Sequence, residues 1–151
     1  MFLCGSYSHQ LDDKNRIRLP SRLRAELGEK YILLPGTKGC IYLVNADDPQ
    51  TIIKSIGLLE SLNPDSEDDL RTLLSASSIV EADAQGRFKL PDNLISFANI
   101  KKDVWINGNI SKVEIWSAES WAERNKRVDN TPKGIDEIYR SLSAKRQEQN
   151  Q

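Results

Sequence analysis

The 151-residue chain contains a single histidine, His9, and only two cysteines, Cys4 and Cys40. One histidine cannot form a histidine pair that binds a metal or relays a proton, and the cysteines form no CxxC pair of the kind that binds zinc. We therefore expect no metal site, no cofactor and no catalytic centre. Both cysteines are expected to fill space in the core of a protein kept in a reducing compartment.

Long apolar runs are also lacking. No segment approaches the roughly 18 consecutive apolar residues of a membrane-spanning helix. The start, MFLCG, has neither the basic residues nor the apolar run of about 7–15 residues that a secretory signal needs. Gly36 and Gly39 flank a hairpin turn and lack the lysine-serine of a phosphate-binding loop. These absences predict a globular protein that stays in the cytoplasm and has no membrane partner.

The net charge is −1 at pH 7, so the chain lacks the basic excess of most nucleic-acid-binding domains. Its charges are nevertheless unevenly distributed, because acidic residues dominate the stretch from 47 to 69 while cations gather between residues 14 and 24. These cations are Lys14, Arg16, Arg18, Arg22 and Arg24. The distribution predicts a basic face on an acidic body.

An internal repeat is the strongest feature that is present. The sequence DDKNRIRLP at residues 12–20 is echoed by DAQGRFKLP at residues 83–91, and a leucine follows each at the same offset. Asp, Arg, Leu and Pro recur identically, and the remaining strand positions keep their apolar or basic character. We infer that the chain contains two copies of one structural unit.

Each copy predicts the same local structure around its motif. A short strand, at residues 7–11 or 78–82, enters a turn of small polar residues. Asn15 and Gly86 occupy equivalent positions, and both residue types tolerate a positive φ, so a tight left-handed turn is expected in each copy. The chain then alternates basic and apolar residues, which predicts a half-buried strand with a cationic outer face.

A short helix and a hairpin are expected to complete each copy. Proline suits a first helical turn, so helices are predicted at residues 21–27 and 92–98. Gly28 and Asn99 follow them and are of the two types favoured just past a helix C-terminus. The hairpins are expected from strands at 31–34 and 40–44 around a turn at 35–39, and from strands at 104–106 and 112–116 around an Asn-Gly-Asn turn at 107–109.

These elements divide the chain into four segments of an α+β protein. Residues 1–50 and 76–121 are predicted to be the two repeat units, and residues 51–75 to connect them. In the connection, Asp48-Pro49 favours a helix to about Leu62, and Ser66 favours a second over 67–74. Residues 122–151 form a polar tail, partly helical or disordered, with a weak apolar stripe at Ile135, Ile138, Tyr139 and Leu142.

The paired D-x-x-x-R motifs, each continued by Leu-Pro and a short helix, resemble the MraZ family of bacterial transcriptional regulators from residue 2 to about residue 121. The resemblance implies two pseudo-symmetric β-α-β units that form a small double-split β-barrel of the swapped-hairpin AbrB-like type. It implies a homo-oligomer in the form of a closed ring. It also implies a nucleoid-associated, sequence-specific repressor that binds double-stranded DNA at short promoter repeats and controls the division and cell-wall gene cluster.

Carried over residue by residue, the family's DNA-contacting motif falls on Asp12, Lys14 and Arg16 in the first copy and on Asp83 and Arg87 in the second. The sequence departs from the family pattern in two places. Asn15 replaces the usual glycine before the motif arginine, which the turn tolerates. Ala84-Gln85 stands where the first copy has Asp13-Lys14, so the second binding face is less charged.

Each basic residue also has a structural interpretation. Arg16 and Arg87 can contact guanine edges or phosphates through the arginine fork, or pair across the turn with Asp12 and Asp83. Both hold at once if the carboxylate aims the guanidinium. The remaining cations are expected either to contact phosphates or to form an ordinary solvated surface. They are Arg18, Lys89, Arg22 and Arg24.

Two other functions remain as alternatives. The first is a ring-forming structural or scaffold module without specific DNA binding. The second is a small hydrolase with Cys4 or Ser8 as nucleophile and His9 as base, which strand alternation and the lack of a third orienting group disfavour. The large aromatic residues are expected in the core and in interfaces instead of stacking on bases. They are Trp105, Trp116, Trp121 and Phe88.

Overall fold

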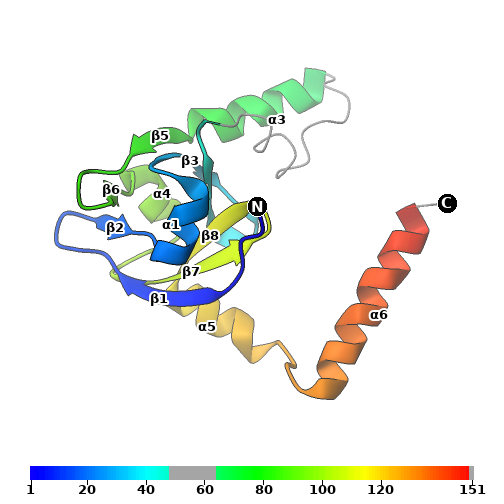
Figure 1. Ribbon diagram of the computed structural model, residues 1–151. Coiled ribbons are helices and arrows are strands. Elements are labelled where there is room, and N and C mark those ends of the chain that lie inside the picture. Colours follow the sequence, from blue (N-terminus) through cyan, green and yellow to red (C-terminus); the bar gives the residue numbers. More distant parts are fainter. Residues whose placement is uncertain (48–63, 150–151) are drawn as a thin grey trace. The chain divides into compact units, whose positions relative to one another are not determined.

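A computed structural model describes residues 1–47 and 64–149 of the chain (Figure 1). The chain divides into two compact units, Met1–Ser120 and Trp121–Gln151. The first unit mixes strands and helices, so the predicted α+β class is confirmed. The connecting helix predicted from Asp48 to Leu62 lies outside the described residues.

The two copies of the repeat fold into the same succession of elements. The first contains β1 (Ser6–Gln10), β2 (Arg16–Arg18), α1 (Ser21–Leu27), β3 (Lys30–Pro35), a 3₁₀ turn (Thr37–Gly39) and β4 (Ile41–Asn45). The second contains β5 (Ser78–Glu81), β6 (Arg87–Lys89), α4 (Asp92–Phe97), β7 (Asp103–Asn109) and β8 (Lys112–Ser117). Helix α3 (Pro64–Ser75) precedes the second copy and confirms the helix predicted over 67–74.

The copies interleave in the sheets. Six strands form one antiparallel sheet in the order β1-β7-β8-β4-β3-β5, and β2 pairs with β6 in a separate two-stranded ribbon. Replacing every strand of the six by its counterpart in the other copy gives the same order read from the opposite end. The first strand of each copy therefore pairs with the hairpin of the other, at β1–β7 and at β3–β5.

The backbone conformations predicted for the turns and helix ends are confirmed. Asn15 and Gly86 have φ values of 58° and 80°, the left-handed region that both motif turns were expected to need. Gly28 and Asn99, which follow α1 and α4, have φ values of 73° and 53°.

The hairpin turn predicted at residues 107–109 is wrong. Strand β7 continues to Asn109, and the chain reverses at Ile110, whose φ is 64°. Leu3 and Ile110 exchange backbone hydrogen bonds of 2.8 and 2.9 Å, so the N-terminal segment lies beside the end of the strand. A Cβ at Gly108 would collide with the backbone of that segment. Glycine is therefore needed here for a close backbone approach and not for a turn.

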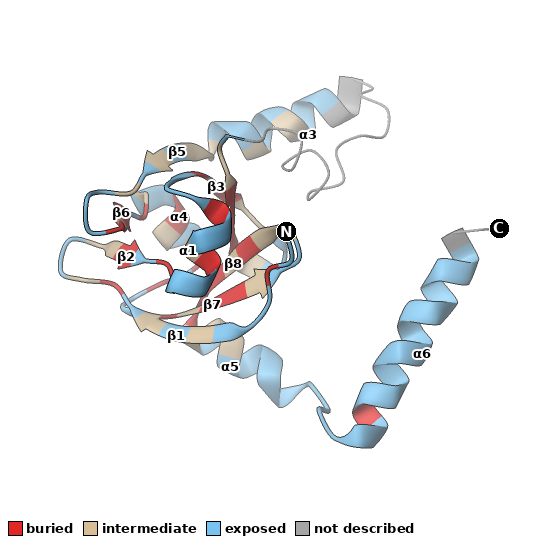
Figure 2. Ribbon diagram, in the orientation of Figure 1, coloured by how far each residue is buried: buried red, intermediate tan, exposed pale blue. Residues whose placement is uncertain are grey.

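A continuous apolar core joins the two copies (Figure 2). The residues beneath the ribbon, Ile17 and Phe88, and those on the inner faces of the sheet and of α1 and α4 are almost completely buried. Members of this core include Leu11, Leu19, Leu23, Leu27, Tyr31, Leu33, Ile41, Leu43, Leu90, Leu94, Val104, Ile106, Val113 and Ile115. The Tyr31 and Phe88 rings pack edge-to-face with 5.1 Å between their centroids, which connects the two copies.

The predicted burial of both cysteines is only half right. Cys40 is fully buried, whereas Cys4 is exposed. Cys4 lies in the N-terminal segment between Leu3, which enters the core, and Gly5, so only its neighbour faces inward. Among the aromatic residues, Phe88 and Trp116 are buried, and Trp105 and Trp121 are half-buried.

The second unit contains most of α5 (Ala118–Lys126) and all of α6 (Pro132–Gln149). The α6 residues Ile135, Ile138, Tyr139 and Leu142 are all exposed and follow helical spacing. In the part of the chain that the structure describes, no helix is long and apolar enough to cross a bilayer.

Candidate nucleic-acid interface

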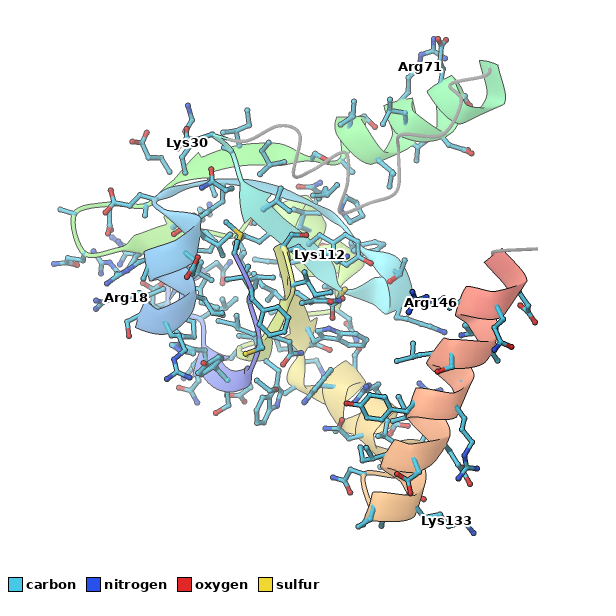
Figure 3. The ribbon with its side chains drawn as sticks, turned by 45° about the vertical axis from the view of Figure 1, so that its right-hand side comes forward. Arg18, Lys30, Arg71, Lys112, Lys133 and Arg146 are labelled. Carbon is cyan, nitrogen blue, oxygen red and sulfur yellow. The ribbon has the colours of Figure 1, made fainter. Side chains whose placement is uncertain are left out.

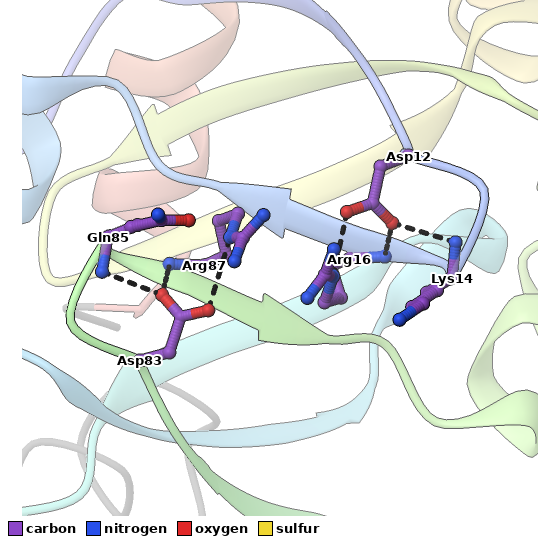
Figure 4. A network of polar contacts seen from close by, with 6 residues as sticks. All are labelled: Asp12, Lys14, Arg16, Asp83, Gln85 and Arg87. Atoms are coloured by element: carbon purple, nitrogen blue, oxygen red, sulfur yellow. Dashed lines mark hydrogen bonds and ion pairs between the residues drawn. The ribbon is translucent and has the colours of Figure 1, made fainter.

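The first motif turn is organised by one carboxylate (Figure 4). Oδ1 of Asp12 accepts hydrogen bonds from the backbone amides of Lys14 and Arg16, at 2.9 and 2.8 Å. Oδ2 accepts from Nε of Arg16 at 2.7 Å. Because one side chain binds both the backbone of the turn and the guanidinium beyond it, Asp12 fixes the turn and aims Arg16 together.

The second motif turn repeats this arrangement. Oδ1 of Asp83 accepts from the backbone amides of Gln85 and Arg87, both at 2.9 Å, and Oδ2 accepts from Nε of Arg87 at 3.1 Å (Figure 4). Nε is the only guanidinium nitrogen recorded in either ion pair. Among the described residues, no contact of a terminal nitrogen of Arg16 or Arg87 is recorded, so these nitrogens can donate to a ligand.

Hydrogen bonding favours the ionised form of both motif carboxyls. The backbone amide of Arg16 contributes most to holding the pKa of Asp12 below its ordinary value, with further help from the Arg16 side chain and the Lys14 amide. For Asp83 the Arg87 amide contributes most, followed by the Gln85 amide and the Arg87 side chain. Both carboxylates are therefore charged at neutral pH.

The ribbon presents four cations on one face. In the β2–β6 register Arg16 lies opposite Lys89, and Arg18 lies opposite Arg87. Side chains alternate along a strand, so these residues share the outer face while Ile17 and Phe88 point into the core. The sequence predicted a cationic face for each strand separately, but only the pairing combines them into one surface.

A hollow of about 640 Å³ lies beside this face. Its lining combines the motif residues with the end of β1, and includes Lys102 from the loop before β7. The backbone amide of Leu11 donates to the Lys102 carbonyl at 2.9 Å, which brings this lysine to the first motif. Sequence reasoning missed Lys102, because nothing local connects it to a motif and only the β1–β7 pairing does so.

The two arginines of α1 differ in their surroundings. Arg22 is exposed, and no ion pair or hydrogen bond to a described residue is recorded for its side chain. Arg24 is half-buried, and its guanidinium lies against Gly86 in the second motif turn. Helical spacing explains the difference, since Arg24 precedes the buried Leu27 by three residues and lies on the same side of α1, whereas Arg22 does not. Figure 3 shows Arg18 at the outer surface beside this helix.

The residues of the hydrolase alternative are also placed. Ser8 and His9 are neighbours in β1, so strand alternation directs their side chains to opposite faces. Burial lowers the pKa of His9. Within residues 1–47 and 64–149, no group of three or more histidine, cysteine, aspartate or glutamate side chains could hold a metal ion.

Fold and site together define a class of protein: an α+β chain with a duplicated strand-turn-strand-helix-hairpin unit, whose two D-x-x-x-R turns meet in one cationic ribbon. The model of the family described as "MraZ protein, putative antitoxin-like" matches residues 2–71 and 73–132. The chain belongs to the MraZ family.

Relatives named transcriptional regulator MraZ are similar to this chain along most of their length. A transcriptional regulator MraZ of Clostridium botulinum (strain Alaska E43 / Type E3) is 40% identical over 126 residues, which cover 83% of this chain and 88% of the relative. The transcriptional regulators MraZ of Syntrophomonas wolfei and Alkaliphilus metalliredigens are 38% and 35% identical, covering 94% and 91% of this chain and 96% and 94% of the relatives.

Proposed function

We propose that the protein is a sequence-specific DNA-binding transcriptional repressor of the division and cell-wall gene cluster. The observation that carries this proposal is the ribbon itself, in which two carboxylate-aimed arginines and two further cations share one outer face. An arginine held through Nε keeps its terminal nitrogens for the O6 and N7 acceptors of guanine in the major groove. Membership of a family whose relatives are named transcriptional regulators supports the same function.

The residues have separate roles in this proposal. Arg16 and Arg87 contact base edges or phosphates, while Asp12 and Asp83 position them. Lys14, Arg18 and Lys89 contact backbone phosphates, which hold the protein on the duplex without reading sequence. Arg24 on α1 adds to this basic surface, whereas Arg22, exposed on the same helix, belongs to the solvated surface. A protein with this function works on the chromosome, in the cytoplasm and associated with the nucleoid.

We further propose that the chain acts as a closed homo-oligomeric ring on short repeated promoter sites. One ribbon neutralises few phosphates, and affinity for duplex DNA grows with the number neutralised. A ring repeats the ribbon, so that neighbouring subunits engage successive repeats at high effective concentration. The mass in solution, measured by light scattering at micromolar concentration, tests this; a monomer would contradict it.

The finer architecture is also a proposal. The interleaved strand order and the paired motif strands support a small double-split β-barrel of two pseudo-symmetric units, residues 1–50 and 76–121. In this division residues 51–75 connect the units and residues 122–151 form a tail.

Fluorescence anisotropy over a salt series tests DNA binding. The full chain is titrated against DNA from upstream of its own gene and against scrambled DNA of equal length. We expect preference for the native fragment, and a loss of about 1–3 kcal/mol, roughly 5- to 150-fold, in Arg16→Ala and Arg87→Ala. Arg71→Ala is the charge-matched control, because Arg71 lies on α3 with its side chain 69% exposed.

The outcomes separate the two main alternatives. Retained assembly with loss of binding in Arg16→Ala supports the regulator. Equal and weak binding to both fragments, unchanged in either variant, would favour the scaffold module.

A further inference from the structure

Three arginines converge on the second motif turn and not on the first. Arg18 lies opposite Arg87 in the ribbon, and the Arg24 guanidinium lies against the backbone of Gly86. A Cβ at Gly86 would collide with Nη1 of Arg24 and would lie 3.4 Å from Nε of Arg18. Gly86 is itself buried by this arrangement.

Two of the three arginines at this turn have no ion-pair partner among the described residues. Arg87 pairs with Asp83, but neither Arg18 nor Arg24 has an ion pair with a described residue. The Arg18 and Arg24 guanidinium groups both lie close to Gly86 and carry the same charge, so they repel one another. A surface that gathers several arginines attracts an anion, and the planar fork of arginine suits a phosphate.

Among the described residues, the first motif has no equivalent of this arrangement. At the constant offset of the repeat, Ile95 of the second copy stands where the first copy has Arg24. The equivalent turn positions also differ. The turn that Arg24 covers has Gly86, and the first motif turn has Asn15. Although the Asp–Arg geometry is duplicated, the surroundings of the two turns are therefore asymmetric.

We propose that Arg18 and Arg24, gathered over Gly86, form a binding site for one phosphodiester group of duplex DNA. The site anchors the second motif to the backbone, and the first motif has no equivalent site. This inference rests on the proposed DNA binding and adds a distinct role to it. It also makes Arg24 a ligand-binding residue, whereas Arg22 in the same helix belongs to the solvated surface.

The test compares Arg24→Ala with Arg22→Ala, which removes the same charge from the same short helix. Binding to upstream and to scrambled DNA is measured by anisotropy over a salt series. Each lost phosphate contact lowers the slope of log K against log salt by about 0.9. We expect this reduction in Arg24→Ala, with equal fold losses on both DNAs because a phosphate contact carries no sequence information. Arg22→Ala is expected to keep the wild-type slope.

A second variant displaces Arg24 without removing it. Gly86→Asn introduces the residue that the first copy uses at a φ of 58°, so the turn can form, but its Cβ occupies the place of the Arg24 guanidinium. We expect Gly86→Asn to lower the slope as Arg24→Ala does, and to add nothing in the Arg24→Ala background. The converse variant, Asn15→Gly, is expected to leave the slope unchanged.

The results distinguish this inference from the function on which it rests. If the wild-type chain binds with a salt-dependent preference for upstream DNA but Arg24→Ala and Arg22→Ala have equal slopes, the phosphate site is refuted and the function stands. If the wild-type chain binds neither DNA, the proposed function itself fails.

Discussion

Ile17 and Phe88 lie directly opposite each other in the β2–β6 ribbon, one from each copy of the repeat, and each is only 2% exposed. The face that carries the cations is thus supported by a core pair that belongs to neither copy alone. The orientation of the motif arginines therefore depends on packing between the copies as well as on the aspartates.

Phe88→Ala is expected to destabilise the fold by about 3–5 kcal/mol, because it removes a buried ring that also packs in a T-shaped pair with Tyr31. Phe97→Ala is the matched control, since Phe97 is 45% exposed and its loss is expected to cost less than about 0.5 kcal/mol. Urea unfolding followed by tryptophan fluorescence measures both. Similar midpoints for the two variants would contradict the role given to the pair.

The motif carboxyls predict a loss of stability in acid. Folding lowers the pKa of Asp12, mainly through the Arg16 amide, so near the ordinary value of 3.8 the unfolded chain binds a proton more readily than the folded chain. The stabilisation is therefore fully present above that value and is lost as the pH falls through the folded pKa. Asp83 acts in the same direction.

We expect the free energy of unfolding of Asp12→Asn to fall less steeply with decreasing pH below about pH 4 than that of the wild type. Asp13→Asn is the control, because no hydrogen bond to the neighbouring Asp13 carboxylate from a described residue is recorded. Urea titrations at a series of pH values measure the slopes, and identical slopes for the wild type and Asp12→Asn would argue against a bonded carboxylate.

The two cysteines are expected to differ in reactivity. Burial, with a smaller contribution from Glu114, raises the pKa of the Cys40 thiol to about 12, and Cys40 is fully buried. Cys4 is exposed. At pH 8 a thiol reagent should label one cysteine per native chain quickly and the second only on unfolding. Cys4→Ser should lack the fast phase; two fast thiols in the native wild type would show that Cys40 is accessible.

Gly108→Ala is expected to destabilise the fold by about 1–3 kcal/mol, because the new methyl group collides with the backbone of Leu3 and Cys4. The destabilisation caused by Gly108→Ala should largely disappear in a chain that lacks residues 1–4. Thermal unfolding of the four chains of this double-mutant cycle measures the coupling. Additive effects would mean that the strain arises elsewhere than at the N-terminal segment.

Local structure was largely predictable from the sequence, and the assembly of that structure was not. Asn15 and Gly86 identified their turns because positive φ is costly for most other residues. The signal failed at Gly108, where the same residue type serves a close approach by residues more than 100 positions away in the chain. Local sequence shows that a glycine is needed. It does not show whether the glycine serves a positive φ or makes room for another backbone segment by lacking a Cβ.

In the candidate site, contacts within a motif could be read from the sequence, and contacts between the copies could not. The D-x-x-x-R spacing suggested the Asp12–Arg16 and Asp83–Arg87 pairs as one of two interpretations of the arginines, and the structure contains both pairs. The position of Arg24 over Gly86 and of Lys102 beside the first motif depends on contacts between the copies. Such contacts leave no periodic pattern in a single sequence.

The interleaved order of the six-stranded sheet also affects how the chain can evolve. Neither copy has a complete set of strand partners of its own, so the arrangement is that of a dimer fused into one polypeptide. In a dimer of identical chains every substitution appears at both motifs, whereas here each motif mutates independently. Lys14 could therefore be kept in one turn while glutamine stands at position 85 in the other, and a symmetric scaffold can come to recognise an asymmetric target.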